Sequence, residues 1–524
     1  MPKPVVYQLL PRLWGNDCPD PVPGGSLSRN GTGKFSGVDT ADLAYLKGLG
    51  VTHVWYTGII RHATTEAFAG CPASDPQIVK GCAGSPYAIV DYYDVNPYLA
   101  DNVHERMNEF TSLLKRTHEA GLKVLIDFVP NHVSRDYGRV GWVRRDARPF
   151  GAGDDCTVHW RPENDFYYYP GQALRLPVPA AAPYPEMPAR ASGNCFSPAP
   201  AVTDWYETVR LNYGDMYTQT WEKMYDIVRY WCRKGVDGFR CDMAELVPRQ
   251  FLQWLIGRIK QEYPDVIFLA EVYRPELYSL YAEEVGFDFL YDKSGLYDVL
   301  RDVARGGTAR RITWNWQSLG PLQPRMLNFL ENHDEQRFAS DFFCGDVRRS
   351  WAFLGASLLF STAPFLVYSG QEVGERGMDA EGFSGRDGRT SIFDWWSLAS
   401  LRRLRRHIHA GTGLTEEEAA ALERWSQLLR CSASPAVSDG KTYDLCYCSR
   451  EVPGFDSDRH FAFLRSGGGE TLLCFCNFGA VPAQLTLPVP QDAVLYLGLP
   501  VSPAPVPMSV PPSGLAIIRL QARP

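Results

Sequence analysis

The sequence predicts an α/β protein built on a (β/α)8 TIM barrel, with a subdomain inserted after the third strand and a C-terminal antiparallel β-domain. Three observations predict this fold. Short apolar runs alternate with helical patterns, which is typical of a parallel sheet with crossover helices. Eight such runs can be counted between residues 5 and 368. No Gly-rich turn follows the first run, as a doubly wound sheet that binds a dinucleotide would require.

Each apolar run is short enough to be a buried strand. The eight expected strands lie around Val5, Val54, Val124, Phe239, Phe268, Phe287, Leu327 and Phe365. Helical patterns separate most of them, at 40–49, 103–120, 217–234, 251–262, 277–284 and 351–360. Eight strand–helix units are the number that closes a barrel.

The alternation is interrupted once and then ends. Residues 134–213 have little periodicity and much Pro, Gly, Ala and Tyr, and this stretch is too long for an ordinary loop. After about residue 430, short strand patterns follow one another at 441–448, 460–465, 471–477, 483–487 and 515–520. We therefore expect a barrel formed by 1–133 and 214–425, an inserted subdomain at 134–213, and a C-terminal β-sandwich domain at 426–524.

Composition excludes several classes of partner. The chain of 524 residues is 45% apolar and carries a net charge of −7, so there is no electrostatic case for nucleic acid or an anionic membrane surface. The uncharged stretch 351–370 is long enough to span a bilayer. It contains a proline and several hydroxyl residues, so a buried helix followed by a strand is the better prediction. No signal peptide precedes the first strand, which favours a cytoplasmic location and leaves an exported form open.

Cysteine pairs with one residue between them occur at 446/448 and 474/476. Such spacing could suggest a metal site. In strands, however, it places both thiols on one face, so we expect buried core cysteines.

Polar residues stand at the ends of four apolar runs, in the segments 127–132, 238–242, 270–272 and 330–334. At the carboxyl ends of barrel strands such residues converge on one face. Arg240 and Asp242 would point the same way from one strand, so the cation would keep the carboxylate ionised. A lone Asp after a strand is more often a helix cap. Together with Glu271 and Asp334, however, Asp242 could supply the acid and the nucleophile of a retaining glycosidase.

These four segments closely resemble the signature regions of the α-amylase family, glycoside hydrolase family 13. The resemblance begins at 6–8, passes through 87–97 and 368–372, and ends in the β-domain. It implies a retaining hydrolase of α-1,4-linked glucans or malto-oligosaccharides that works through a covalent glycosyl-Asp intermediate. A transglycosylase or isomerase acting on sucrose, trehalose or maltose is the alternative, because only the acceptor differs. A third possibility is an inactive binding protein, which the intact carboxylates argue against.

The resemblance also implies a role for each catalytic residue. Asp242 corresponds to the nucleophile and Glu271 to the general acid that later acts as base. Asp334 corresponds to the third carboxylate, which grips sugar hydroxyls and favours a distorted ring. Arg240 corresponds to the residue that keeps Asp242 charged and oriented.

Further residues correspond to the sugar-binding set. His132 and His333 resemble the histidines that bind the sugar at the cleavage subsite, Tyr87 the aromatic that stacks on it, and Asp127 a residue that braces the site. No cofactor is implied for the chemistry. A structural calcium ion is possible, held by Asn131, acidic residues of the insertion and a main-chain carbonyl near residue 246.

Three features depart from the family or remain open. Glu245 and Leu246 stand where many α-amylases have Lys-His, which puts ordinary endo-amylase subsites in doubt. The loop 64–84 precedes Tyr87 and could form a wall of the cleft. The tryptophan pairs 314/316 and 395/396 could bind sugars, although core packing is more typical of such spacing.

Overall fold

A computed structural model describes residues 3–139, 147–500 and 503–520. Eight parallel strands close into a barrel in the order β1-β14-β13-β12-β11-β10-β5-β2. All eight expected strands are the strands of this barrel, so the prediction of a (β/α)8 fold is confirmed. Their bounds are β1 Val5–Leu9, β2 His53–Tyr56, β5 Lys123–Phe128, β10 Gly238–Cys241, β11 Ile267–Ala270, β12 Phe289–Tyr291, β13 Met326–Phe329 and β14 Phe365–Tyr368.

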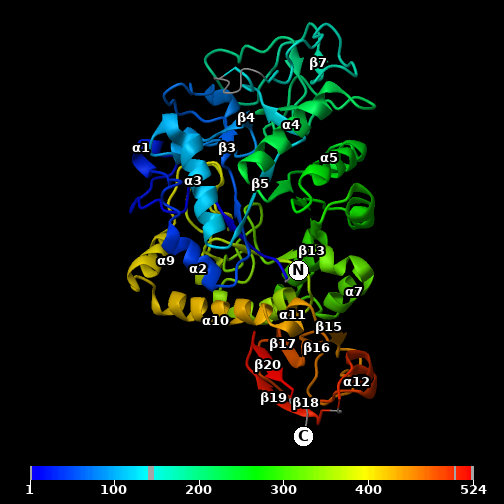
Figure 1. The fold of residues 1–524 in the computed structure, drawn as a ribbon. Coiled ribbons are helices and arrows are strands. Elements are labelled where there is room, and N and C mark those ends of the chain that lie inside the picture. Colours follow the sequence, from blue (N-terminus) through cyan, green and yellow to red (C-terminus); the bar gives the residue numbers. More distant parts are fainter. Residues whose placement is uncertain (1–2, 140–146, 501–502, 521–524) are drawn as a thin grey trace.

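Helices surround the barrel (Figure 1). Capping boxes begin two of them, with Asp39 before α2 and Thr415 before α10. Gly235, with a φ of 99°, ends α4 in the left-handed conformation that favours glycine. The helices are α2 Thr40–Gly48, α3 Arg106–Glu119, α4 Gln219–Lys234, α5 Arg249–Glu262, α6 Asp298–Ala304, α7 Arg310–Leu319, α8 Ser350–Leu354, α9 Ala399–Ala410, α10 Glu416–Ser432 and α11 Pro435–Ser438.

Some helical expectations were only partly right. The expected helix at 277–284 is a π-helical turn over Leu280–Val285, and the one at 351–360 is the short α8 followed by a π-helical turn over Gly355–Leu359. This last segment leads into β14, so the stretch 351–370 is a buried helix followed by a strand. Within the described part of the chain, no helix has both the length and the apolar character needed to cross a bilayer.

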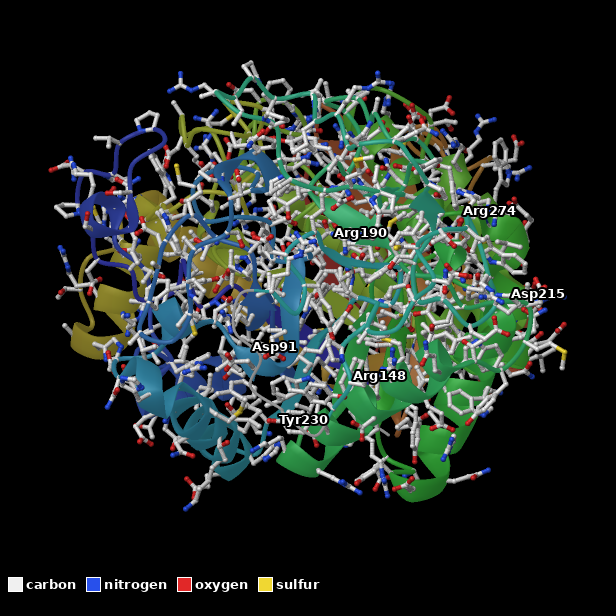
Figure 2. All side chains as sticks on the ribbon, turned by 90° about the horizontal axis from the view of Figure 1, so that it is seen from above. Asp91, Arg148, Arg190, Asp215, Tyr230 and Arg274 are labelled. Atoms are coloured by element: carbon white, nitrogen blue, oxygen red, sulfur yellow. The ribbon has the colours of Figure 1, made fainter. Side chains whose placement is uncertain are left out.

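The inserted segment begins and ends at the mouth of the barrel. Its first strand, β6 (His132–Ser134), pairs with its last, β9 (Thr208–Arg210). Between them lies a short pair, β7 (Tyr168–Tyr169) and β8 (Ala189–Arg190). Figure 1 shows the insertion at one end of the barrel, and Arg190 lies near the middle of the view onto that end in Figure 2.

A buried ion network stabilises the insertion. The carboxylate of Glu186 lies 2.6 Å from Nη1 of Arg135 and 2.6 Å from Nη2 of Arg190. All three side chains are at least nine-tenths buried. Because a buried carboxylate with two cations and further hydrogen bonds is fully satisfied, this network gives the insertion a defined shape.

The C-terminal β-domain lies at the other end of the molecule (Figure 1). It has a four-stranded antiparallel sheet in the order β15-β16-β17-β20 and a two-stranded ribbon, β18-β19. The elements are β15 Lys441–Asp444, β16 His460–Gly467, β17 Glu470–Asn477, β18 Ala483–Leu487, α12 Gln491–Leu497, β19 Val506–Val510 and β20 Leu515–Arg519. The boundaries proposed above at 133/134, 213/214 and 425/426 stay predictions.

The prediction of buried core cysteines was right for one of the two pairs. Cys474 and Cys476 are fully buried in β17. The strand expected at 441–448 ends at Asp444, and Cys446 and Cys448 lie in the following turn, partly buried. The side chain of Asp444 accepts a hydrogen bond from the Cys446 amide at 2.7 Å, which turns the chain there.

Candidate active site

Arg240 lies at the centre of a cluster of carboxylates. Its Nη1 is 2.6 Å from Oδ1 of Asp242, and its Nη2 is 2.9 Å from Oε1 of Glu271 and 3.7 Å from Oδ2 of Asp334. The guanidinium is fully buried, and the rings of Trp55, Tyr87 and Tyr291 lie within 5.6 Å of it. Carboxylates from three different strand ends therefore converge on one cation.

The barrel register explains this convergence. Arg240 of β10 pairs with Asp127 of β5 on one side and Leu269 of β11 on the other. Asp242 and Glu271 follow directly after β10 and β11, so both extend past the strand ends at the same edge. The amide of Asp242 donates to the carbonyl of Phe128 at 2.8 Å, which continues the strand pairing as far as the carboxylate.

Asp242 experiences opposing electrostatic effects. Burial, which is the largest effect, and the carboxylate of Glu271 raise its pKa to about 8 against the opposing effect of Arg240. The expectation that Arg240 keeps Asp242 ionised stays a prediction, because Arg240 lowers this pKa as expected but burial opposes it. Burial and the carboxylate of Glu271 thus favour the protonated form of Asp242, against the effect of Arg240.

Two hydrogen-bond donors and one cation hold Glu271. The amide of Met243 donates to Oε2 at 2.8 Å, the hydroxyl of Tyr273 donates to Oε1 at 2.5 Å, and Arg240 faces Oε1. Met243 is one of the few described non-glycine residues with a positive φ, at 45°. This left-handed conformation costs energy for a residue with a Cβ, and it accompanies a backbone amide that faces the carboxylate.

A second group of polar residues surrounds Asp334. Nε2 of His333 lies 3.0 Å from Oδ2 of Asp334 and 2.5 Å from the hydroxyl of Tyr87. Burial and the nearby Arg240 lower the pKa of His333, so its ring is neutral. Nε2 of Gln8 lies 2.7 Å from Nδ1. With the amide of Gln8 as donor, Nδ1 accepts and Nε2 carries the proton that faces Asp334.

Asp127 lies deeper in the barrel. It accepts hydrogen bonds from the Tyr87 hydroxyl at 3.3 Å and the Gly58 amide at 3.2 Å. Burial raises its pKa to about 6. The rings of Tyr87 and His333 are stacked with centroids 5.5 Å apart, so Asp127, Tyr87 and His333 form one connected unit.

A cavity of about 240 Å³ opens beside these residues. Five of the site residues expected from the sequence line it, namely Tyr87, His132, Asp242, Glu271 and Asp334. Arg240, Asp127 and His333 lie behind them and contact them through the bonds given above. Burial and nearby cations lower the pKa of His132 to about 3, so this histidine is neutral at the cavity wall.

The expected calcium ligands were tested by their contacts. Nη2 of Arg210 donates to the carbonyl of Leu246 at 2.9 Å, and its Nη1 donates to the carbonyl of Gly193 at 3.1 Å. Nδ2 of Asn131 donates to the same Gly193 carbonyl at 2.9 Å. Calcium is bound by oxygens that face the ion. Here a guanidinium already pairs with the Leu246 carbonyl, so these residues do not fit a calcium ion.

Several contributors could not be recognised in the sequence. Tyr273 stands two residues after Glu271, and its hydroxyl donates to that carboxylate. The only sequence feature that could have indicated this role is an aromatic residue at that spacing after a strand. Gln8 and Trp55 reach the site from β1 and β2 and read as ordinary strand residues. Of the tryptophans considered as sugar binders, Trp395 and Trp396 are buried core residues.

Comparison with known proteins places the chain in a family. Residues 25–396 match the family model described as alpha amylase, catalytic domain. Alpha-amylase 3 of Dictyoglomus thermophilum is 24% identical over 64% of this chain and 59% of its own length. A cyclomaltodextrinase of Geobacillus thermopakistaniensis is 22% identical over 93% of this chain and 70% of its own length. An alpha-amylase of Haloarcula japonica is 25% identical over 86% of this chain but 54% of its own length. The chain thus spans little more than half of two of these relatives.

Solved structures share the fold. The alpha-amylase from Geobacillus thermoleovorans complexed with acarbose is 18% identical, with a TM-score of 0.65 over 100% of this chain and 99% of that one. A noncanonic maltogenic alpha-amylase from Thermotoga neapolitana is 22% identical, with a TM-score of 0.61 over 99% of this chain and 96% of that one. Both likenesses concern the fold.

Proposed function

The chain belongs to the α-amylase family, and from that premise we propose that it is a retaining glycoside hydrolase of α-1,4-linked glucans or malto-oligosaccharides. The observation that carries the proposal is the contact of one planar guanidinium with both Asp242 and Glu271. Carboxyl groups of retaining enzymes lie about 5–5.5 Å apart, whereas inverting enzymes leave about 6.5–9.5 Å for a water molecule. One arginine that contacts both carboxyl groups favours the shorter separation, which is that of retaining enzymes.

In the first step Asp242 acts as the nucleophile. Its Oδ1 is held by Arg240, which leaves Oδ2 to form a bond with the anomeric carbon. The bond from that carbon to the glycosidic oxygen breaks, and Glu271 gives its proton to the departing oxygen. The product of this step is a glycosyl ester on Asp242.

In the second step a water molecule attacks the anomeric carbon. Glu271, now ionised, takes a proton from the water, the new carbon–oxygen bond forms, and the ester bond to Asp242 breaks. The two inversions give net retention. Glu271 regains its proton, so the enzyme returns to its starting state.

A proton held among the buried carboxyl groups is consistent with these two reaction steps. Cleavage needs one carboxylic acid and one carboxylate, and a cluster that holds a proton near neutral pH supplies that combination. Although burial raises the pKa of Asp242, bond cleavage requires Asp242 to be ionised and Glu271 to carry the proton. Asp334, whose side chain is 38% exposed, is placed to accept hydrogen bonds from sugar hydroxyls.

The direct test is a time course of products from maltoheptaose, pullulan and sucrose, with the wild type beside Asp242→Asn. We expect shorter malto-oligosaccharides or glucose from maltoheptaose with the wild type alone. Products longer than the substrate would indicate transglycosylation instead of hydrolysis, and rearranged disaccharides would indicate isomerisation. No turnover of any α-glucoside by pure, folded wild type would contradict the proposal.

A further inference from the structure

The loop 64–84 is fixed to one rim of the cavity. Its Ala83 amide donates to the carbonyl of Phe393 at 2.9 Å. Gly81 lies so close to this residue that an added Cβ would stand 2.2 Å from the Phe393 oxygen. Phe393 follows β14 and lines the cavity. The contact therefore joins the loop after β2 to the loop after β14.

The same loop is also fixed to the insertion. Ile78 is fully buried in a small apolar cluster with Leu174, Tyr184 and Ala189 of the insertion. Val79 is buried in another cluster with Ala63, Ala88 and Val90. Adjacent residues of the loop thus pack in two directions, and this packing holds the loop as a wall.

An ion pair completes the wall at the cavity surface. Nζ of Lys80 lies 3.1 Å from Oε2 of Glu207 and donates to the Asp204 carbonyl at 3.2 Å. The two side chains are 11% and 5% exposed, and both residues line the cavity. Glu207 directly precedes β9, the partner strand of the segment that carries His132. The pair joins the loop to the insertion beside that histidine.

The order of strands places this wall away from the general acid. The wall is built on the segments that follow β14, β2 and β5, which lie together around β1 in the closed barrel. Glu271 follows β11, which lies three places from β14 and from β2 and two places from β5 around the ring of eight strands. The leaving group departs beside Glu271, so the wall lies on the side of the sugar that becomes bound to Asp242.

We propose that this wall closes the cavity beyond a single sugar, so that the enzyme acts on the terminal glucose at the non-reducing end of α-glucan chains. The inference rests on the function proposed above and narrows its substrate. The cavity of about 240 Å³ is smaller than the range of about 300–1,000 Å³ typical of pockets for drug-sized ligands. The Lys80–Glu207 pair offers a donor and an acceptor to the hydroxyls at the far end of that glucose.

The test compares maltoheptaose labelled at its reducing end with the same compound carrying a 4,6-O-benzylidene group on the non-reducing glucose. The wild type is expected to shorten the free compound by one glucose at a time. It is expected to cleave the blocked one at least about 100-fold more slowly, because the added ring meets the wall. Equal rates on both compounds, or a first labelled product two units shorter, would overturn the inference and leave hydrolysis standing. If the enzyme turns over neither compound, the proposed function is overturned and this inference with it.

A double substitution tests the ion pair itself. Lys80→Ala with Glu207→Ala removes both charges, so no unpaired charge stays buried. Turnover of the free compound is expected to fall, because contacts to the terminal glucose are lost, and the ratio of blocked to free rates is expected to rise at least about 10-fold. The control is Lys115→Ala with Glu119→Ala, an exposed pair 3.7 Å apart, which should leave the ratio unchanged. An unchanged ratio in a folded Lys80/Glu207 variant would remove these residues from the inference.

Discussion

Nη1 of Arg240 lies 2.6 Å from Oδ1 of Asp242, in an ion pair buried beneath the cavity. The second nitrogen of the same guanidinium faces Glu271. A lysine carries its charge on a single nitrogen and cannot present two parallel donors. The geometry of Asp242 and Glu271 therefore depends on an arginine at this position.

Arg240→Lys should lower kcat by more than about 100-fold, because removal of a preorganised charge contact at the reacting groups has effects of this size. The cation is retained, so the protein should remain folded. Steady-state kinetics together with a circular dichroism spectrum check this. A folded Arg240→Lys variant with wild-type kcat would contradict the shared-arginine geometry.

Asp242→Asn should abolish turnover, because an amide cannot form the glycosyl ester. We expect kcat to fall by more than about 1,000-fold. Arg240 keeps its contact with Glu271, so thermal unfolding should be little changed or shifted upward. Purification on fresh resin controls for traces of wild type. Substantial activity in such a preparation would exclude Asp242 as the nucleophile.

Asp242 should also make stability depend on pH. Burial raises its pKa from 3.8 to about 8, so between these values the folded state binds a proton that the unfolded state has lost. Stability from this group is therefore greatest at low pH and falls as the pH rises towards 8. Asparagine does not titrate. The Tm of Asp242→Asn minus that of the wild type should be larger at pH 8 than at pH 5, and equal differences would contradict the raised pKa.

Tyr273→Phe should reduce kcat more than it changes KM. The hydroxyl donates to Glu271 at 2.5 Å, and burial beside that carboxylate raises the pKa of Tyr273, so the phenol stays protonated. Loss of a hydrogen bond to a charged group costs about 1.5–3 kcal/mol, equivalent to about 10- to 150-fold in rate.

A matched control for that substitution is Tyr281→Phe, whose buried hydroxyl donates to the Ala244 carbonyl at 3.3 Å. This variant should keep the wild-type kcat. If Tyr273→Phe and Tyr281→Phe have equal kcat, Tyr273 has no positioning role towards Glu271.

Chelation should leave the protein unchanged. Arg210 already donates to the Leu246 and Gly193 carbonyls, so the wild-type Tm should be the same in EDTA and in excess calcium chloride. Arg210→Ala should lower the Tm by several degrees, because two carbonyls lose a charged donor. Arg210→Lys should restore part of the loss. A fall in the wild-type Tm with EDTA that calcium reverses would show a bound ion.

The barrel could be predicted because its signal is local. Each of its strands is a short apolar run, and the polar residues that follow, such as Asp242 and Glu271, stand directly at its end. The helices α6, α7, α9, α10, α11 and α12 were not predicted. In α9 a run of arginines and histidines conceals the few apolar positions, Leu401 and Leu404, that face the core.

Contacts between distant segments could not be predicted. Arg210 and Leu246 are 36 residues apart, and Lys80 and Glu207 are joined only after the insertion folds back along β6 and β9. The electrostatics of Asp242 likewise depended on how deeply it is buried, which a sequence pattern does not report. In both cases tertiary packing decides the outcome.

The central claim is that Asp242 becomes covalently bound to the sugar. The most direct measurement is mass spectrometry of the protein and its peptides after reaction with 5-fluoro-α-D-glucosyl fluoride, which slows the second step more than the first. The account predicts one glycosyl adduct, on the peptide that contains Asp242, and none in Asp242→Asn. An adduct on any other residue would contradict it.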